Sequence, residues 1–139
     1  MPFGGFIMGD CGVALIIEDD SSIQTCLTMA LEFENWRVLA ANNGKVALNL
    51  LIEGFFPDLI LLDMVMPCFD GLYFLRERRL VPYLRSIPVL VMTAQQDISS
   101  LDDFSGDIKG ILRKPIPYDE LIQCVNKFRK GAVSVGFSN

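Results

Sequence analysis

Short apolar runs alternate with amphipathic stretches along the chain. Five runs are predicted to form strands, at residues 13–17, 36–41, 57–63, 87–93 and 107–114. The stretches between them mostly show helical spacing of apolar residues; after the first strand, for example, Ile23, Leu27, Ala30 and Leu31 lie at i, i+4, i+7 and i+8. The pattern therefore predicts five repeats of a strand followed by a helix.

The predicted strands are continuously apolar rather than alternating, which is typical of a parallel sheet covered by helices on both faces. Right-handed crossovers then restrict the topology to a doubly wound α/β fold. One stretch departs from the repeat: residues 94–107 are rich in Ser and Asp, which compete with helical hydrogen bonds. We expect the fourth helix to be abbreviated or mobile.

Composition narrows the function classes. The chain has 139 residues, the size of one domain, and 12 basic against 17 acidic residues give a net charge of −5. No basic run exceeds Arg78–Arg79, so no nucleic-acid partner is expected. The absence of histidine excludes Ser-His-Asp and Cys-His catalysis. No apolar run approaches the about 20 residues of a membrane span, and four widely spaced cysteines indicate reduced thiols in the cytoplasm.

Polar residues end four of the five predicted strands. Glu18 and Asp19 follow the first, and Asp63, Thr93 and Lys114 end the third, fourth and fifth. A doubly wound fold brings these ends to one edge, where ligands bind. Carboxylates gathered there repel one another unless a cation is present, and oxygen ligands without His or Cys suit Mg²⁺. A lysine and a hydroxyl beside that ion suit a phosphoryl group.

Four motifs carry a family resemblance, and they are LIIEDDSS (15–22), LILLDMVMPCFDG (59–71), VLVMTA (89–94) and LRKP (112–115). Over residues 13–130 the chain resembles the receiver (CheY-like) domain of two-component response regulators. The resemblance implies a flavodoxin-like sheet with strand order 2-1-3-4-5. Residues 1–12 and 131–139 are then expected to be terminal tails.

The resemblance also implies how the site works. Asp63 would accept a phosphoryl group from a histidine of a sensor histidine kinase or histidine phosphotransfer protein. Lys114 would pair with the phosphoryl oxygens, Thr93 would move to hydrogen-bond them, and the Lys114–Pro115 bond would be cis. The domain would be no classical enzyme but a signalling domain that assists its own phosphorylation and dephosphorylation. Its output would be altered binding to an unknown protein, as a monomer or weak dimer.

A magnesium ion is the cofactor that the resemblance implies. Asp19 and Asp63 would bind it through carboxylate oxygens, Glu18 through a water, and Val65 through its main-chain carbonyl. The residues two positions after Asp63 and after Thr93, which are Val65 and Gln95, influence how water reaches the acyl phosphate in this family. Because Val65 cannot orient a water and Gln95 can, we expect slow to moderate self-dephosphorylation.

The same residues bear on three alternative functions. Ile111 stands where the family usually has an aromatic switch residue, which leaves open a pseudo-receiver that scaffolds partners without phosphorylation. A phosphohydrolase of the haloacid dehalogenase type would need an acid two residues after Asp63, where the chain has Val65. A flavodoxin-like electron carrier would need a phosphate-cradling loop after the first strand, where the chain has acidic residues.

Overall fold

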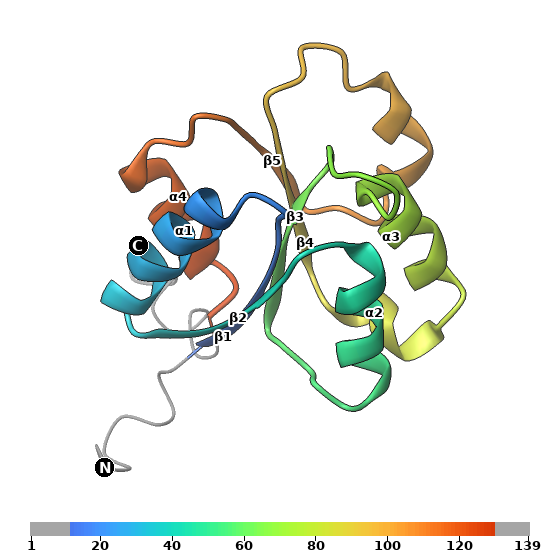
Figure 1. The fold of residues 1–139 in the computed structure, drawn as a ribbon, viewed down its shortest axis with the longest axis horizontal. Coiled ribbons are helices and arrows are strands. Elements are labelled where there is room, and N and C mark those ends of the chain that lie inside the picture. Colours follow the sequence, from blue (N-terminus) through green and yellow to red (C-terminus); the bar gives the residue numbers. More distant parts are fainter. Residues whose placement is uncertain (1–11, 130–139) are drawn as a thin grey trace.

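A computed structural model describes residues 12–129 of the chain. It contains a five-stranded parallel sheet in the order β2-β1-β3-β4-β5, which confirms the predicted doubly wound fold and its strand order (Figure 1). The strands are β1 (Gly12–Ile17), β2 (Trp36–Ala41), β3 (Leu59–Asp63), β4 (Val89–Thr93) and β5 (Gly110–Arg113). The expected terminal tails lie outside the described residues, apart from Gly12, which begins β1.

The central strands explain the continuous apolar runs. Every residue of β3 and β4 is buried, including Asp63 and Thr93 at their carboxyl ends. The parallel register places Leu62 beside both Ile17 and Val91, so β1, β3 and β4 end at the same edge of the sheet. Chemically active side chains at these ends therefore meet at that edge, as expected for this class of fold.

Helices cover the two faces of the sheet. α1 and α4 lie on one face, whereas α2 and α3 lie on the other (Figure 1). Successive residues of a strand point to opposite faces, so Ala14 and Ile16 pack with the first pair of helices and Leu15 and Ile17 with the second. The backbone of the sheet thus separates two apolar cores. The bounds are α1 (Ser21–Phe33), α2 (Gly44–Ile52), α3 (Gly71–Arg79) and α4 (Tyr118–Asn126).

Side-chain caps fix the start of three helices at the edge where the polar residues meet. The carboxylates of Asp20 and Asp70 and the amide oxygen of Asn43 each accept a hydrogen bond from the backbone N–H three residues later. Such caps satisfy N–H groups that have no partner within the helix. The caps therefore fix the residues at which α1, α2 and α3 begin after their preceding strands.

The connection between β4 and β5 differs from the others. Among the described residues, its only helix is the short 3-10 helix η3 (Ser99–Phe104), which confirms the expected abbreviated fourth helix. Leu101 and Phe104 of η3 are buried in the core beneath α2 and α3. β5 begins at Gly110, whereas the sequence pattern predicted a start at residue 107.

Arg79 at the end of α3 anchors the η3 segment. Its Nε and Nη2 donate to one carboxylate oxygen of Asp107 over 3.1 and 2.9 Å, and Nη2 also donates to the carbonyl of Asp103. Its guanidinium group lies 4.2 Å from the centre of the Phe104 ring. These contacts tie the carboxyl end of η3 and the residues after it to α3, so tertiary contacts support this segment in place of the missing helix.

The neighbouring Arg78 is buried, with 2% of its surface exposed. Its Nη2 donates to the carbonyls of Arg85 and Ile87 at 3.0 and 2.7 Å, and its Nη1 lies 3.5 Å from Asp107. Burial lowers the pKa of Arg78, and the charge of Asp107 opposes this shift. Because a guanidinium stays protonated in proteins, the fold contains a buried charge that depends on Asp107.

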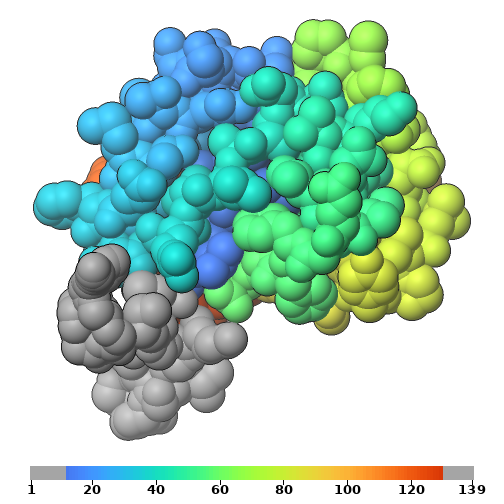
Figure 2. All heavy atoms as spheres, turned by 60° about the horizontal axis from the view of Figure 1, so that its bottom comes forward, coloured from blue at the N-terminus to red at the C-terminus, as the bar shows by residue number. Residues whose placement is uncertain are grey.

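A second 3-10 helix, η2 (Pro82–Ser86), follows α3 and leads back to β4. Figure 2 shows the end of α2 and the turn after it (green) next to η2 (yellow) on the surface of the molecule. Leu84 of η2 is fully buried in the core under α2 and α3.

Within residues 12–129, no helix is both long and apolar enough to cross a membrane.

Candidate functional site at the carboxyl edge of the sheet

Three carboxylates converge at the carboxyl edge of the sheet. Glu18 and Asp19 follow β1 and Asp63 ends β3, and one carboxylate oxygen of each lies within 4.8 Å of the others. Glu18 and Asp63 are buried, whereas Asp19 is exposed to solvent. The structure thus brings together the acidic residues that the sequence placed at these strand ends.

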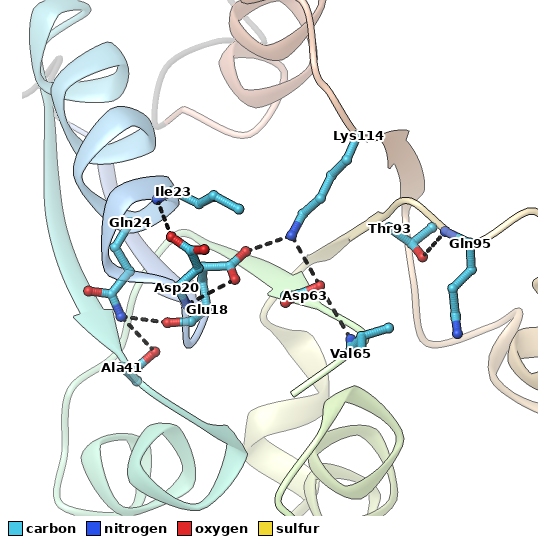
Figure 3. Close-up of polar contacts among 10 residues, drawn as sticks. All are labelled: Glu18, Asp20, Ile23, Gln24, Ala41, Asp63, Val65, Thr93, Gln95 and Lys114. Carbon is cyan, nitrogen blue, oxygen red and sulfur yellow. Dashed lines mark hydrogen bonds and ion pairs between the residues drawn. The ribbon is translucent and has the colours of Figure 1, made fainter. Parts of the chain in front are cut away.

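Lys114, just after β5, reaches into this acidic group. Its Nζ lies 2.8 Å from Oε1 of Glu18 and 3.3 Å from Oδ1 of Asp63 (Figure 3). Burial by itself lowers the pKa of Lys114, but the hydrogen bond with Glu18 and the charges of Asp63 and Glu18 outweigh it, so the pKa is raised. The lysine is therefore held in its charged form between two carboxylates.

Burial raises the pKa of the Glu18 carboxyl. The hydrogen bond from Lys114 opposes this shift, and the charge of Asp63 adds to it. The backbone N–H of Asp20 also donates to Oε2 of Glu18 over 3.2 Å. Glu18 is thus a carboxylate with both oxygens engaged, in contrast to the exposed carboxylate of Asp19.

Thr93 ends β4 and is fully buried. Its Oγ1 accepts a hydrogen bond of 3.0 Å from the backbone N–H of Gln95, and Figure 3 shows the hydroxyl facing Gln95. Arg113 at the end of β5 donates to the carbonyl of Gln95. The side chains of Thr93 and Arg113, at the ends of the neighbouring strands β4 and β5, therefore both hold the first residues of the β4–η3 connection.

An open cleft of about 410 Å³ lies above the acidic group. Val65, Ala94 and Gln95 line it together with the charged residues. The backbone N–H of Val65 donates to Oδ1 of Asp63 over 3.3 Å, which turns that carboxylate toward the cleft. Val65 and Gln95, the two positions expected to flank the reaction, thus both border the space beside Asp63.

The β3–α3 turn that carries Val65 is closely packed. The backbone N–H of Gly71 donates to the carbonyl of Met64 over 3.3 Å. A Cβ at position 71 would lie 2.5 Å from Sδ and 2.8 Å from Cα of Met64, and 3.0 Å from the carbonyl oxygen of Asp63. Only glycine lets α3 start this close to the strand end, so Gly71 helps to set the position of Asp63.

An apolar groove of about 450 Å³ adjoins the cleft. It lies between α1 and the β5–α4 connection, and Lys114 and Ala94 border both spaces. The Lys114–Pro115 peptide bond in its wall is cis, as the resemblance implied. Its apolar lining includes Ile23, Cys26, Leu27, Met92 and Ile116.

The sequence pattern missed Gln24, Asn42 and Arg113, which are the polar residues that brace this site. Gln24 Nε2 lies 2.5 Å from the Glu18 carbonyl and 2.9 Å from Oδ1 of Asn42. One available signal was that Gln24 stands four residues after the capping residue Asp20, and so lies on the same side of α1. Asn42 and Arg113 carried no signal, because their partners lie far away in the sequence.

A doubly wound α/β domain with three carboxylates and a lysine at the carboxyl edge of its sheet has the arrangement expected of a response regulator receiver domain. Comparison with known families agrees with this class: the family model of the response regulator receiver domain matches residues 14–126. The chain belongs to this family, whose members transduce signals in two-component systems.

The curated relatives are regulatory proteins that are longer than this chain. The response regulator MprA of Mycolicibacterium vanbaalenii is 33% identical over 109 residues, which cover 78% of this chain and 46% of the relative. The regulatory protein AtoC of Escherichia coli is 31% identical over 108 residues, which cover 77% of this chain and 23% of the relative. The chain thus spans about a quarter to a half of the length of the relatives it matches.

Solved structures share the fold. A putative response regulator from Chloroflexus aurantiacus aligns with a TM-score of 0.76 and 29% identity, covering 84% of this chain and 96% of that one. The receiver domain of the sensor histidine kinase PA1611 from Pseudomonas aeruginosa, with a magnesium ion coordinated in its active-site cleft, aligns with a TM-score of 0.74 and 25% identity. That alignment covers 84% of this chain and 96% of the other.

Proposed function

We propose that Asp63 is the phosphoacceptor of this receiver domain. A carboxylate oxygen of Asp63 attacks the phosphorus of a phosphohistidine on a sensor histidine kinase or phosphotransfer protein. The bond from phosphorus to the histidine nitrogen breaks, and that nitrogen keeps the electron pair and takes up a proton. The observation that carries this proposal is the Lys114 ammonium, held 3.3 Å from Oδ1 of Asp63 at the edge of an open cleft.

The donor set fits a magnesium ion. Glu18, Asp19 and Asp63 offer only carboxylate oxygens, which are hard ligands of the kind that Mg²⁺ takes in proteins. Asp19 and Asp63 would hold the ion directly, Glu18 through a water, and Val65 through its main-chain carbonyl. When bound, the ion would offset the negative charge on the phosphoryl oxygens.

Lys114 and Thr93 would respond to the new phosphoryl group. The added charge of about −1.5 to −2 gives Lys114 a stronger partner than the Asp63 carboxylate. If the hydroxyl of Thr93 turns toward the phosphoryl oxygens, the N–H of Gln95 loses the acceptor that it has now. We propose that the β4–η3 connection is the first segment to rearrange, and that signalling follows from altered binding to an output protein.

The apolar groove beside the cleft suits the histidine-bearing partner. Its walls are apolar, and Lys114 borders both the groove and the cleft, so a partner seated on α1 would carry its histidine to Asp63. The described cysteines Cys26, Cys68 and Cys124 are free thiols. Free thiols suit the reducing cytoplasm, where we place the protein.

The test is the intact mass of the protein after incubation with acetyl phosphate, with and without Mg²⁺. We expect a gain of one phosphoryl group that needs Mg²⁺, is lost in Asp63→Asn and persists in Asp97→Asn, which changes an exposed carboxylate outside the site. No mass gain in the wild type, together with no Mg²⁺ binding, would favour the phosphorylation-independent scaffold. Hydrolysis of a generic phosphomonoester would instead revive the hydrolase alternative.

Val65 is expected to limit the loss of the phosphoryl group. Its exposed, apolar side chain borders the cleft and offers a water no hydrogen bond. In Val65→Asn we expect dephosphorylation to accelerate about fivefold, which corresponds to one added hydrogen bond of about 1 kcal/mol. The measurement is the decay of the phosphorylated mass after the donor is removed. Val46→Asn, at an exposed position on α2, is the control, and an unchanged decay in Val65→Asn would refute the expectation.

A further inference from the structure

The side chain of Gln24 connects two turns at the edge of the candidate site. Its Nε2 lies 2.5 Å from the carbonyl oxygen of Glu18 and 3.5 Å from the carbonyl oxygen of Ala41 (Figure 3). The same atom lies 2.9 Å from Oδ1 of Asn42. The first acceptor belongs to the β1–α1 turn, and the other two belong to the end of β2 and the turn into α2. The amide of one α1 side chain therefore bridges the two connections beside the acidic cleft.

The bridge acts on the backbone that presents the acidic pair. The N–H of Glu18 donates to the carbonyl of Ala41 over 3.0 Å, and the carbonyl of Glu18 accepts from Gln24. Both main-chain polar groups of Glu18 are thus tied to neighbouring segments. The peptide group that the Glu18 carbonyl belongs to is the one that leads into Asp19.

Asp19 depends on this backbone more than Glu18 does. The Glu18 side chain is fixed separately, by Lys114 and by the N–H of Asp20. Within residues 12–129, no hydrogen bond or ion pair holds the exposed Asp19 carboxylate, so its direction follows from the turn that carries it. A shift of the Glu18 carbonyl would therefore move one carboxylate of the trio relative to the other two.

We infer that Gln24 is a positioning residue for the metal site, which holds the β1–α1 turn so that Asp19 stays aligned with Glu18 and Asp63. The inference rests on the proposed magnesium site. Loss of a residue that hydrogen-bonds a metal-ligating side chain typically changes metal affinity about 10–100-fold. Gln24 acts at the lower end of this range, because it holds the ligand's backbone rather than its carboxylate.

The experiment compares Gln24→Met with the wild type by calorimetric Mg²⁺ titration and by the rate of phosphoryl gain from acetyl phosphate. Met keeps the length of the side chain and removes both donors. We expect the dissociation constant for Mg²⁺ to rise about tenfold, while the rate at saturating Mg²⁺ returns to within about twofold of the wild-type rate. Thr25→Val, an exposed neighbour on α1, is the matched control and should leave the dissociation constant unchanged.

Asn42→Ala is a second variant that tests the same bridge from its other end. We expect a smaller rise in the dissociation constant, and no further rise when it is combined with Gln24→Met, since the bridge is then already broken. An unchanged Mg²⁺ affinity in folded Gln24→Met would overturn the inference, as would a loss of rate that saturating Mg²⁺ does not restore. Should Gln24→Met fail to fold, an unchanged affinity in Asn42→Ala overturns it. A wild type that binds no Mg²⁺ would refute the proposed site itself.

Discussion

Replacing Asp107 with asparagine is expected to lower the free energy of unfolding by about 3 kcal/mol, because the buried Arg78 guanidinium loses its carboxylate partner. Arg78 is 2% exposed, and its Nε has no hydrogen-bond partner among the described residues. The carbonyls of Arg85 and Ile87 remain as acceptors, but they carry no compensating charge. The more exposed pair of Arg79 with Asp107 adds less than about 1 kcal/mol.

Urea unfolding of the variants measures this loss. Asp103→Asn is the matched control, because Asp103 is exposed and takes part in the anchor through its main-chain carbonyl. The double variant Arg78→Met with Asp107→Asn should recover part of the stability, since it removes the buried charge that Asp107→Asn alone leaves without a partner. A double variant no more stable than Asp107→Asn would show that an uncompensated charge is not the cause.

Gly71→Ala is expected to damage both the fold and the proposed phosphoacceptor site. The new Cβ would lie 2.8 Å from Cα of Met64 and 3.0 Å from the carbonyl oxygen of Asp63, and a side-chain rotation cannot relieve contacts with backbone. Overpacking of this kind costs about 1–3 kcal/mol. Because the displaced backbone carries Asp63, a shift of about 1 Å would slow phosphoryl gain about 100-fold.

Gly106→Ala provides the control for this variant. A Cβ at Gly106 would meet nothing within 4 Å, so its stability and phosphorylation rate should stay close to wild type. Urea unfolding and the initial rate of mass gain with acetyl phosphate separate the two effects. A Gly71→Ala protein that is phosphorylated at the wild-type rate would show that the β3–α3 turn has room to adjust without moving Asp63.

The buried strands and the polar residues at their carboxyl ends could be predicted from the sequence. A continuous apolar run has one arrangement that buries both faces, so the runs ending in Asp63 and Thr93 predicted β3 and β4 and the edge where their ends meet. The acidic group and Lys114 followed from that edge. The strand order and the cis bond before Pro115 could be predicted only from the family motifs, because the spacing of apolar residues gives no information about either.

The contacts that brace the site could not be predicted in the same way. Arg78 follows an amphipathic pattern in which a charged residue is expected to face solvent, and it is buried because Asp107, 29 residues later, folds back beside it. The same interaction explains the late start of β5, since Asp107 is held by α3 rather than by the sheet. Gln24 depends likewise on Asn42 in a different turn.

The sheet separates two apolar cores, so substitutions in one core need not affect the packing of the other. Leu27 and Leu121 pack on one side of it, and Phe74 and Phe104 pack on the other, in clusters that share no member. Substitutions in such independent regions combine additively in their effect on stability. The packing on the α1 side of the domain can therefore change while the packing on the α3 side stays as it is, and a substitution on one side needs no compensating substitution on the other.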